Sequence, residues 1–227
     1  MKESTEIDAL LEISEAITSD LYLDEVLRLI VTVTAEVMNS EICSLMLLDE
    51  KRQELVIRST QSVSEAYTRK PNIKLGQGIV GRVAQQNRPI MVEDVKRDNR
   101  YINQEIARKE GLCSLLSVPL STKGKVVGVF NCYTSTLHQF TAKEIAFLQT
   151  IAAEAAVVIE NAELLTTTKI IREQLETRKI VEQAKKILIE EEGINEEEAH
   201  RRIQRHSMQS NRAMRQIAEA ILLTSRL

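Results

Sequence analysis

Apolar residues recur at helical spacing in two segments near the start of the chain. In residues 7–17 and again in residues 26–38 they return every three or four positions, which is typical of helices that bury one face. The period changes at residues 42–48, a short apolar run followed by a polar turn and a second run at 54–58. The pattern predicts two helices and then a β-hairpin.

A second hairpin is predicted by apolar runs at 115–120 and 126–133, which flank a turn at 121–125. Between the hairpins, the glycine-containing segment 75–81 is expected to turn into a short helix, and residues 89–92 are expected to form a short strand. Strands and helices are segregated along the chain. The predicted class is therefore α+β with an antiparallel sheet.

A long connecting helix is predicted from residue 142. Thr141 and Glu144 form a capping box, and neither Gly nor Pro occurs between residues 141 and 192. A seam of small and apolar residues recurs along it at alternating steps of four and three: Leu148, Ala152, Ala155, Ile159 and Ala162. Two interpretations stay open, a parallel coiled coil between two copies or packing of this face on the domain's own sheet.

The end of the chain is predicted to form three helices. An apolar pattern beyond Thr168 stops at Gly193, Asn195 and Glu198 suit a new helix start, and a last pattern covers residues 214–222. The residues expected to form the small core are Ile180, Val181, Ala184, Ile187, Leu188, Ile203, Met214, Ile217 and Ile221. A unit this small gains stability from a dimer or from the preceding helix.

Charge is distributed unevenly in this chain of 227 residues with net charge −3. From His200 onward there are six Arg and one Glu, which makes a local basic surface that attracts polyanions.

We found no uncharged apolar run of about 18 residues, and the first residues carry acids where a signal peptide carries bases. We therefore expect a cytoplasmic protein without a membrane partner.

Several segments together resemble the GAF family of sensory domains: residues 76–84, 89–95, 117–120, 128–131, 138–141 and 159–162. The resemblance covers residues 4–165, so we predict a sensory domain over 1–165. It implies a six-stranded antiparallel sheet with helices behind it and a small-molecule pocket in front. Polar residues within these motifs are the pocket candidates: Arg82, Asp94 and Asn131. Alternatively, Asp94 caps a loop and Arg82 lies on the surface.

The tail is similar to the ANTAR family of RNA-binding antiterminator domains over residues 169–227. The matching positions are Arg178, Ile180, Ala184, Lys185, Leu188, Glu198, Ala199, Arg202, Ser207, Asn211 and Ala218. Lys186 replaces a usual glycine and His200 a usual aromatic residue. The resemblance implies a three-helix domain that binds paired hairpins in leader transcripts and prevents a terminator from forming. Residues 142–177 would then be a signalling helix or coiled coil overlapping the end of the first domain.

RNA hairpins are recognised through phosphate contacts and through hydrogen bonds to exposed loop bases, which require Arg, Lys and Asn side chains. The RNA-binding candidates are Arg178, Lys185, Lys186, Arg202, Arg205, Asn211, Arg212 and Arg215. Asn211 is expected either to read a base edge or to cap the last helix.

Catalytic patterns were not found in the sequence. His138, His200 and His206 lack a zinc spacing, and the glycines at 76, 78 and 81 lack the flanking strand and acid of a dinucleotide site. We expect neither an enzyme nor a metal site, and no cofactor can be assigned. The thiols of Cys43, Cys113 and Cys132 all fall in predicted strands, so convergence on the sheet in a redox or metal sensor is an alternative to three buried free thiols.

The hypothesis that unites these features is a signal-responsive transcription antiterminator that binds RNA hairpins, forms a homodimer and responds to a small molecule of unknown identity. A dimeric protein–protein scaffold that does not touch RNA is a further alternative. Salt-dependent affinity for hairpin RNA distinguishes the two.

Overall fold

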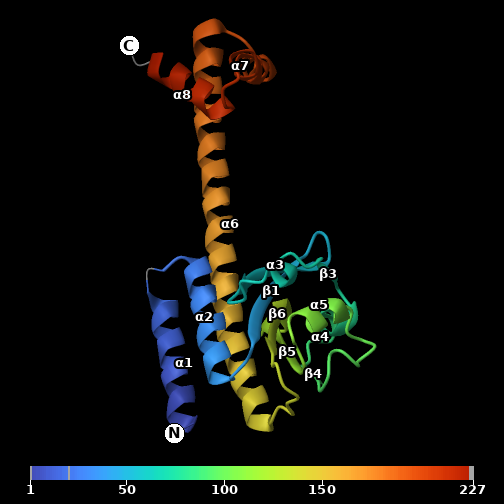
Figure 1. Ribbon diagram of the computed structural model, residues 1–227. Coiled ribbons are helices and arrows are strands. Elements are labelled where there is room, and N and C mark those ends of the chain that lie inside the picture. The colour runs from blue at the N-terminus through green and yellow to red at the C-terminus, as the bar shows by residue number, and fades with distance from the viewer. Residues whose placement is uncertain (1, 20, 225–227) are drawn as a thin grey trace. The chain divides into compact units, whose positions relative to one another are not determined.

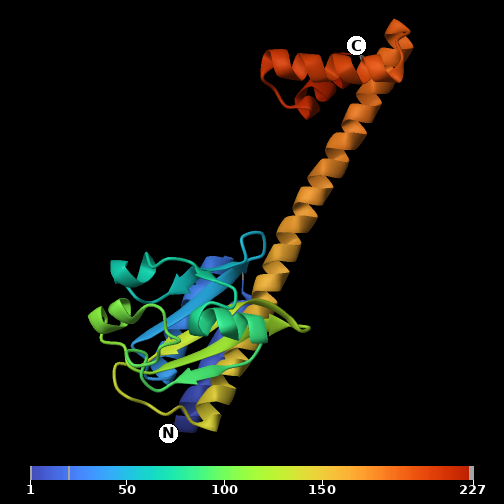
Figure 2. The same ribbon diagram turned by 90° about the vertical axis from the view of Figure 1, so that its right-hand side faces the viewer.

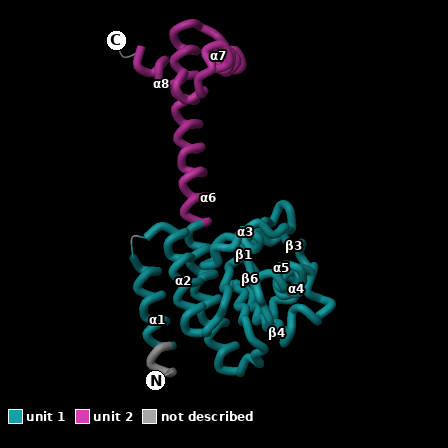
Figure 3. The backbone as a smooth tube through the Cα atoms, viewed as in Figure 1, with its two compact units in different colours: residues 1–162 teal, residues 163–227 magenta. Residues whose placement is uncertain are grey.

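The computed structural model describes residues 2–19 and 21–224 and divides the chain into two compact units, Met1–Ala162 and Glu163–Leu227 (Figures 1 and 3). The first unit contains a six-stranded sheet with helices on both faces. The second consists of helices. The predicted α+β class, with a long helix followed by C-terminal helices, is confirmed.

The sheet is antiparallel throughout, with strand order β3-β2-β1-β6-β5-β4. Its strands are β1 (Ile42–Asp49), β2 (Glu54–Thr60), β3 (Ile73–Lys74), β4 (Ile90–Val92), β5 (Leu115–Thr122) and β6 (Lys125–Tyr133). Both predicted hairpins are present, as β1–β2 and β5–β6. The pairing of β1 with β6 joins them at the centre of the sheet.

Three helices lie side by side on one face of the sheet: α1 (Lys2–Thr18), α2 (Leu23–Val37) and the first turns of α6 (Ala142–Glu192) (Figures 1 and 2). Their apolar faces form one cluster with side chains of the sheet such as Leu45 and Phe130, both fully buried. Burying each large aliphatic side chain contributes about 1.5–3 kcal/mol. Thr141 and Glu144 cap the start of α6 as predicted, since each side chain accepts from the other's backbone N–H.

The predicted seam on α6 lies inside this cluster. Leu148, Ala152 and Ala155 are completely buried, and Ile159 is almost so, against α2 and the sheet. A coiled-coil seam between two copies through these four residues is therefore wrong, because they have no surface left to present. Packing on the domain's own sheet is the interpretation that holds. Ala162 is half-buried.

The opposite face of the sheet is covered by three short helices, α3 (Glu65–Thr68), α4 (Gly78–Gln86) and α5 (Gln104–Lys109). Tyr67 of α3, Ile79 of α4 and Ala107 of α5 share one buried cluster with the strands. The hydrophobic pattern of the sequence predicts α4 but neither α3 nor α5, because helices of four and six residues are too short to show periodicity.

The glycines before and within α4 have a structural explanation. A Cβ on Gly81 would lie 2.3 Å from the carbonyl oxygen of Lys74, so only glycine permits this approach of α4 to β3. Gly76 has a φ of +79°, the left-handed region that favours glycine. The glycine pattern is accounted for by the turn into α4.

The second unit forms a small core where the last turns of α6 meet α7 (Glu196–Ser210) and α8 (Met214–Thr224). Val181, Ala184 and Ile203 are buried at its centre. Gly193 follows α6 with a φ of +68°, and the Asn195 side chain accepts from the backbone N–H of Glu198 to start α7. The predicted stop and start are confirmed. The first of the three predicted helices is continuous with the connecting helix.

Helix α6 is 51 residues long and, among the described residues, alone has the length and hydropathy to cross a membrane, with a window of mean hydropathy 1.4. Part of that window is buried, and Phe147, Leu148, Ile151 and Ile159 pack into the core of the first unit. Core helices of globular proteins have the same composition.

Candidate functional site

The three predicted pocket residues occupy different environments. Asn131 of β6 is fully buried on the sheet. Asp94 follows β4, accepts from the backbone N–H of Lys96 and pairs with Arg97 at 3.4 Å, so its loop-capping alternative is observed. It also lines a surface recess of about 500 Å³ with Arg97 and Arg100. Among the described residues, no hydrogen bond or ion pair joins any two of Arg82, Asp94 and Asn131.

Asn131 belongs to a polar row that crosses three strands. In the register of the sheet it lies opposite Ser44 of β1 on one side and Ser117 of β5 on the other. All three residues are completely buried. The Ser117 hydroxyl donates to Oδ1 of Asn131 at 2.7 Å, but Nδ2 of Asn131 has no partner among the described residues. The row therefore contains an unused donor within an apolar sheet.

Three of the chain's four tyrosines gather beside this row. The rings of Tyr67 and Tyr133 meet edge to face at 6.0 Å, and those of Tyr101 and Tyr133 at 6.3 Å. The Tyr67 hydroxyl is 2.7 Å from Oγ of Ser44. Burial raises the pKa of Tyr67 and Tyr133, so both hydroxyls stay protonated and available for hydrogen bonds.

Lys70 completes the cluster. Its ammonium nitrogen lies 3.8 Å from the centre of the Tyr67 ring and 6.0 Å from that of Tyr133. The residue is 8% exposed, and within the described part of the chain Nζ has no hydrogen-bond partner. Burial lowers its pKa to about 7. Within the described part of the chain, the site thus contains two buried donors without acceptors, Lys70 Nζ and Asn131 Nδ2, next to aromatic rings that favour a cation.

Sequence reasoning found Asn131 but missed the other members of the cluster. Ser44 and Ser117 did give a signal, since each is a polar residue at an inward position of an apolar strand. Lys70 gave none. It lies between α3 and β3, in a polar segment that is typical of a surface loop.

The three cysteines do not converge. Sγ of Cys43 and Sγ of Cys132 are 3.5 Å apart on paired strands, whereas Cys113 precedes β5 and its Sγ is 3.0 Å from Nζ of Lys96. The prediction that all three lie in strands is wrong for Cys113. Within the described residues, no group of three His, Cys, Asp or Glu side chains could hold a metal ion. Burial raises the pKa of Cys43, which disfavours the reactive thiolate.

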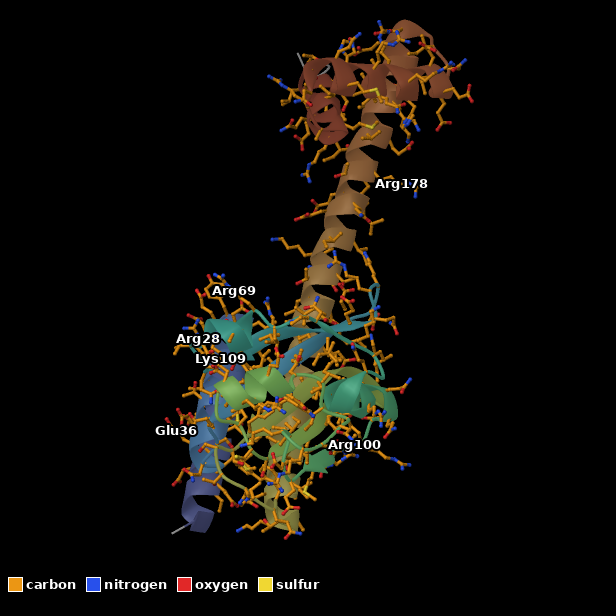
Figure 4. All side chains as sticks on the ribbon, turned by 45° about the vertical axis from the view of Figure 1, so that its right-hand side comes forward. Arg28, Glu36, Arg69, Arg100, Lys109 and Arg178 are labelled. Atoms are coloured by element: carbon orange, nitrogen blue, oxygen red, sulfur yellow. The ribbon has the colours of Figure 1, made fainter. Side chains whose placement is uncertain are left out.

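The predicted RNA-binding residues fall into two groups. Three are engaged within the protein: Lys185 with Glu182 and Glu196, Arg202 with Glu192, and Arg215 with Glu219 and Glu176. The other cations are exposed and lack an ion pair with any described residue: Arg178, Lys186, Arg205 and Arg212. Figure 4 shows Arg178 projecting outward from α6. Free surface cations are the ones that can neutralise phosphates without first breaking an internal pair.

Asn211 ends α7 rather than capping α8. Its φ of 52° and ψ of 37° place it in the left-handed region, where Asn is among the better tolerated residues. The adjoining turn is fixed by the Ser207 hydroxyl, which donates to the carbonyl of Arg212 at 2.6 Å. The Asn211 side chain is exposed. Its amide is therefore free to contact a ligand.

A groove of about 620 Å³ lies between α6 and the two following helices, lined by Arg178, His200 and Met214 among others. His200, which stands where the family has an aromatic residue, also lines an adjacent recess with Lys185 and Arg201. Glu173 and Glu182 line the groove as well. The groove itself is of mixed charge, and of the four unpaired cations Arg178 lines it.

Apolar side chains also remain exposed on α6 in the second unit. Leu164 and Leu175 are 57% and 54% exposed, and Ile171 is 50% exposed. From Leu164 the steps to Thr168, Ile171 and Leu175 are four, three and four residues, which places the four on one side of the helix.

Comparison with known proteins agrees with both units. Residues 21–160 match the GAF domain family and residues 170–222 match the ANTAR domain family. A GAF domain of a phosphoenolpyruvate-protein phosphotransferase from Coxiella burnetii superposes with a TM-score of 0.66 at 24% identity, covering 72% of this chain and 98% of that one. The GAF domain of the Acinetobacter phosphoenolpyruvate-protein phosphotransferase has a TM-score of 0.62 at 26% identity. The match covers 71% of this chain and 97% of that one.

Among curated proteins, the methyl sulfide methyltransferase-associated sensor of Methanosarcina acetivorans is 29% identical over 160 residues, 68% of this chain and 16% of that protein. The phosphoenolpyruvate-dependent phosphotransferase system protein of Escherichia coli is 27% identical over 153 residues, which are 67% of this chain and 20% of that protein. The chain thus spans a fifth or less of the length of these relatives. It belongs to the GAF domain family and carries an ANTAR domain after its GAF domain.

Proposed function

We propose that this protein is a cytoplasmic, signal-controlled antiterminator that binds hairpins in leader transcripts through its ANTAR domain. The observation that carries the proposal is a set of exposed cations on that domain that have no ion pair with any described residue, Arg178, Lys186, Arg205 and Arg212. Each of them can displace a counterion that is condensed on the RNA and contact a phosphate at little structural cost. Asn211 lies directly before Arg212 and offers an amide for a loop base.

The engaged cations have a different role in this proposal. Lys185, Arg202 and Arg215 each join two segments of the domain through carboxylates, so they hold the helices that present the free cations. We assign them to positioning, and the free group together with Asn211 to direct contact.

The proposal is tested by transcription in vitro through a leader that contains two hairpins and a terminator, with the purified full chain added. Read-through is expected to rise with wild-type protein and to fall with Arg212→Ala. Arg201→Ala is the matched control, because Arg201 is exposed on the same domain but already paired with Glu197 and Glu198. No read-through with the wild-type chain, or equal loss in both variants, contradicts the proposal.

We also propose a homodimer, with its seam on a different part of α6 from the one first expected. The exposed stripe Leu164, Thr168, Ile171 and Leu175 has the alternating spacing of a coiled coil. A second copy of the same stripe is a self-complementary partner that removes these side chains from water. Dimerisation would also pair two ANTAR domains for the two hairpins of one transcript.

The pair Cys43 and Cys132 supports a second candidate, a thiol-based redox sensor. Their sulfurs are 3.5 Å apart on adjacent strands, so the two thiols could pass two electrons and two protons to an azo oxidant such as diamide, which becomes a hydrazine, and form one S–S bond. The test is hairpin affinity of the wild type and of Cys43→Ala with and without diamide. An oxidant response that is absent from the variant supports the redox sensor, whereas equal behaviour excludes it.

A further inference from the structure

The unpaired donors of the sensory unit indicate what kind of molecule it detects. Isolated buried ammonium groups are costly, and the aromatic rings of Tyr67 and Tyr133 offset only part of the cost for Lys70. No described carboxylate pairs with it. A hydrogen-bond acceptor on a bound molecule would offset the rest of that cost.

The second donor lies in the same connected cluster. Lys70 sits over the ring of Tyr67, and the Tyr67 hydroxyl contacts Ser44. Ser44 in turn lies directly across from Asn131, whose Nδ2 has no partner among the described residues. Paired residues on adjacent antiparallel strands have Cα atoms about 4.5–5.5 Å apart. Both unsatisfied groups therefore belong to one chain of neighbouring side chains, Lys70–Tyr67–Ser44–Asn131, on one face of the sheet.

We propose that the GAF domain of this protein binds a small organic monoanion, whose carboxylate accepts from Nζ of Lys70 and from Nδ2 of Asn131. This inference rests on the proposed function in that it names the signal at the sensory domain. The tyrosine rings and the apolar neighbours Leu112 and Leu115 would surround the uncharged part of the ligand.

Charge balance favours a carboxylate over a phosphate. The cluster supplies a single cation, while a phosphate monoester carries about −1.5 to −2 charge at neutral pH. Burying the excess negative charge without a second cation is unfavourable. A carboxylate, in contrast, is neutralised by Lys70 and keeps one oxygen for the amide of Asn131.

The experiment measures the thermal unfolding midpoint of the full chain with acetate, propionate or benzoate. Acetamide, propionamide and benzamide serve as neutral counterparts of similar shape, and inorganic phosphate as the doubly charged probe. We expect at least one carboxylate to raise the midpoint while its amide and phosphate do not. If no carboxylate raises it, or if the amides act equally, the proposal is overturned.

Two variants locate the effect. Lys70→Met removes the ammonium but keeps an unbranched side chain, and is expected to abolish the carboxylate response while raising the midpoint of the unliganded protein. Arg69→Met is the control, because Arg69 is the adjacent cation and its side chain is 78% exposed (Figure 4). A carboxylate response that survives Lys70→Met, or one lost equally in Arg69→Met, overturns the assignment.

Hairpin binding separates this inference from the proposed function. Unliganded Lys70→Met is expected to bind hairpin RNA as the unliganded wild type does, since Lys70 lies in the sensory unit. If the wild-type chain binds no hairpin, the proposed function fails, and the carboxylate response still decides the ligand class by itself.

Discussion

Nζ of Lys185 lies 2.8 Å from Oε1 of Glu196, so a residue expected to contact RNA instead connects α6 to the first turn of α7. A second bond to Glu182 at 2.9 Å completes the arrangement. These carboxylates raise the pKa of Lys185, with the hydrogen bond to Glu196 as the main cause, and keep it charged. Its neighbour Lys186 is exposed and lacks an ion pair with any described residue.

The adjacent lysines should therefore respond differently to the same substitution. Lys185→Met is expected to lower the thermal unfolding midpoint of the protein slightly, because the link between α6 and α7 is lost. Lys186→Met should leave unfolding unchanged and reduce the salt dependence of hairpin binding, with a slope smaller by about 0.7–0.9. Calorimetry and fluorescence anisotropy measure the two effects. The opposite assignment would follow if only Lys185→Met changed the slope while unfolding stayed the same.

Asn211 can be tested without disturbing its backbone. Asn211→Ala introduces a residue that tolerates the left-handed conformation less well than Asn, a conformation that costs L-residues about 1–2 kcal/mol, whereas Asn211→Gly keeps the geometry and removes the amide. If the amide reads a loop base, Asn211→Gly should bind loop-scrambled and matched hairpins with nearly equal affinity. Wild-type discrimination in Asn211→Gly would leave Asn211 a role in ending α7 alone.

Two substitutions on α6 distinguish its buried face from its exposed stripe. Ile159→Glu places a carboxylate in the core and should reduce the free energy of unfolding by on the order of 3 kcal/mol or more. Leu164→Glu is expected to leave the fold intact and shift the protein from dimer to monomer. Sedimentation velocity with circular dichroism checks both. An unchanged mass for folded Leu164→Glu would rule out the proposed seam.

Lys70 should make stability depend on pH. Its pKa of about 7 lies below the ordinary value of 10.5, so the unfolded chain binds this proton more tightly. Stability should therefore rise as the pH increases from about 7, by at most about 1.4 kcal/mol per pH unit from this group.

Other buried groups of the first unit limit the useful pH range. Tyr67, Tyr101, Tyr133 and Cys43 have raised pKa values because of burial, and they oppose the rise once their unfolded forms ionise above about pH 8.5. Urea unfolding between pH 7 and that limit should show a rise in the wild type that is absent from Lys70→Met. Parallel curves for the two proteins would show that Lys70 carries its charge in the folded state.

Local patterns predicted much of the fold. The capping pairs Thr141 with Glu144 and Asn195 with Glu198 are interactions within four residues, so sequence spacing was sufficient to find them. The environment of Leu148, by contrast, depends on contacts with residues far away in the sequence. The same spacing suits a seam between copies or a core face, and only the position of α2 and the sheet decides between them.

The composition of the candidate sites was harder to predict from the sequence than the fold, because it depends on tertiary contacts. Lys70 is buried because α3 and β3 place it over Tyr67, and nothing in its sequence neighbourhood indicates this. Arg202 and Arg215 are the same residue type as Arg212 and lie in the same basic region. Each of them nevertheless forms an ion pair with a glutamate of α6, whereas Arg212 does not pair with any described residue. Counting charges along the chain identified a basic region but could not separate paired from free side chains.

The central claim is that the free cations of the ANTAR domain bind hairpin RNA, and the most direct measurement is the salt dependence of that affinity. We would compare the wild type with a variant carrying alanine at Arg178, Lys186, Arg205 and Arg212, after circular dichroism shows that the variant is folded. The account predicts a steep loss of wild-type affinity with salt and a slope smaller by about 3 in the variant. A wild-type affinity that does not depend on salt, or identical slopes for the two proteins, would contradict it.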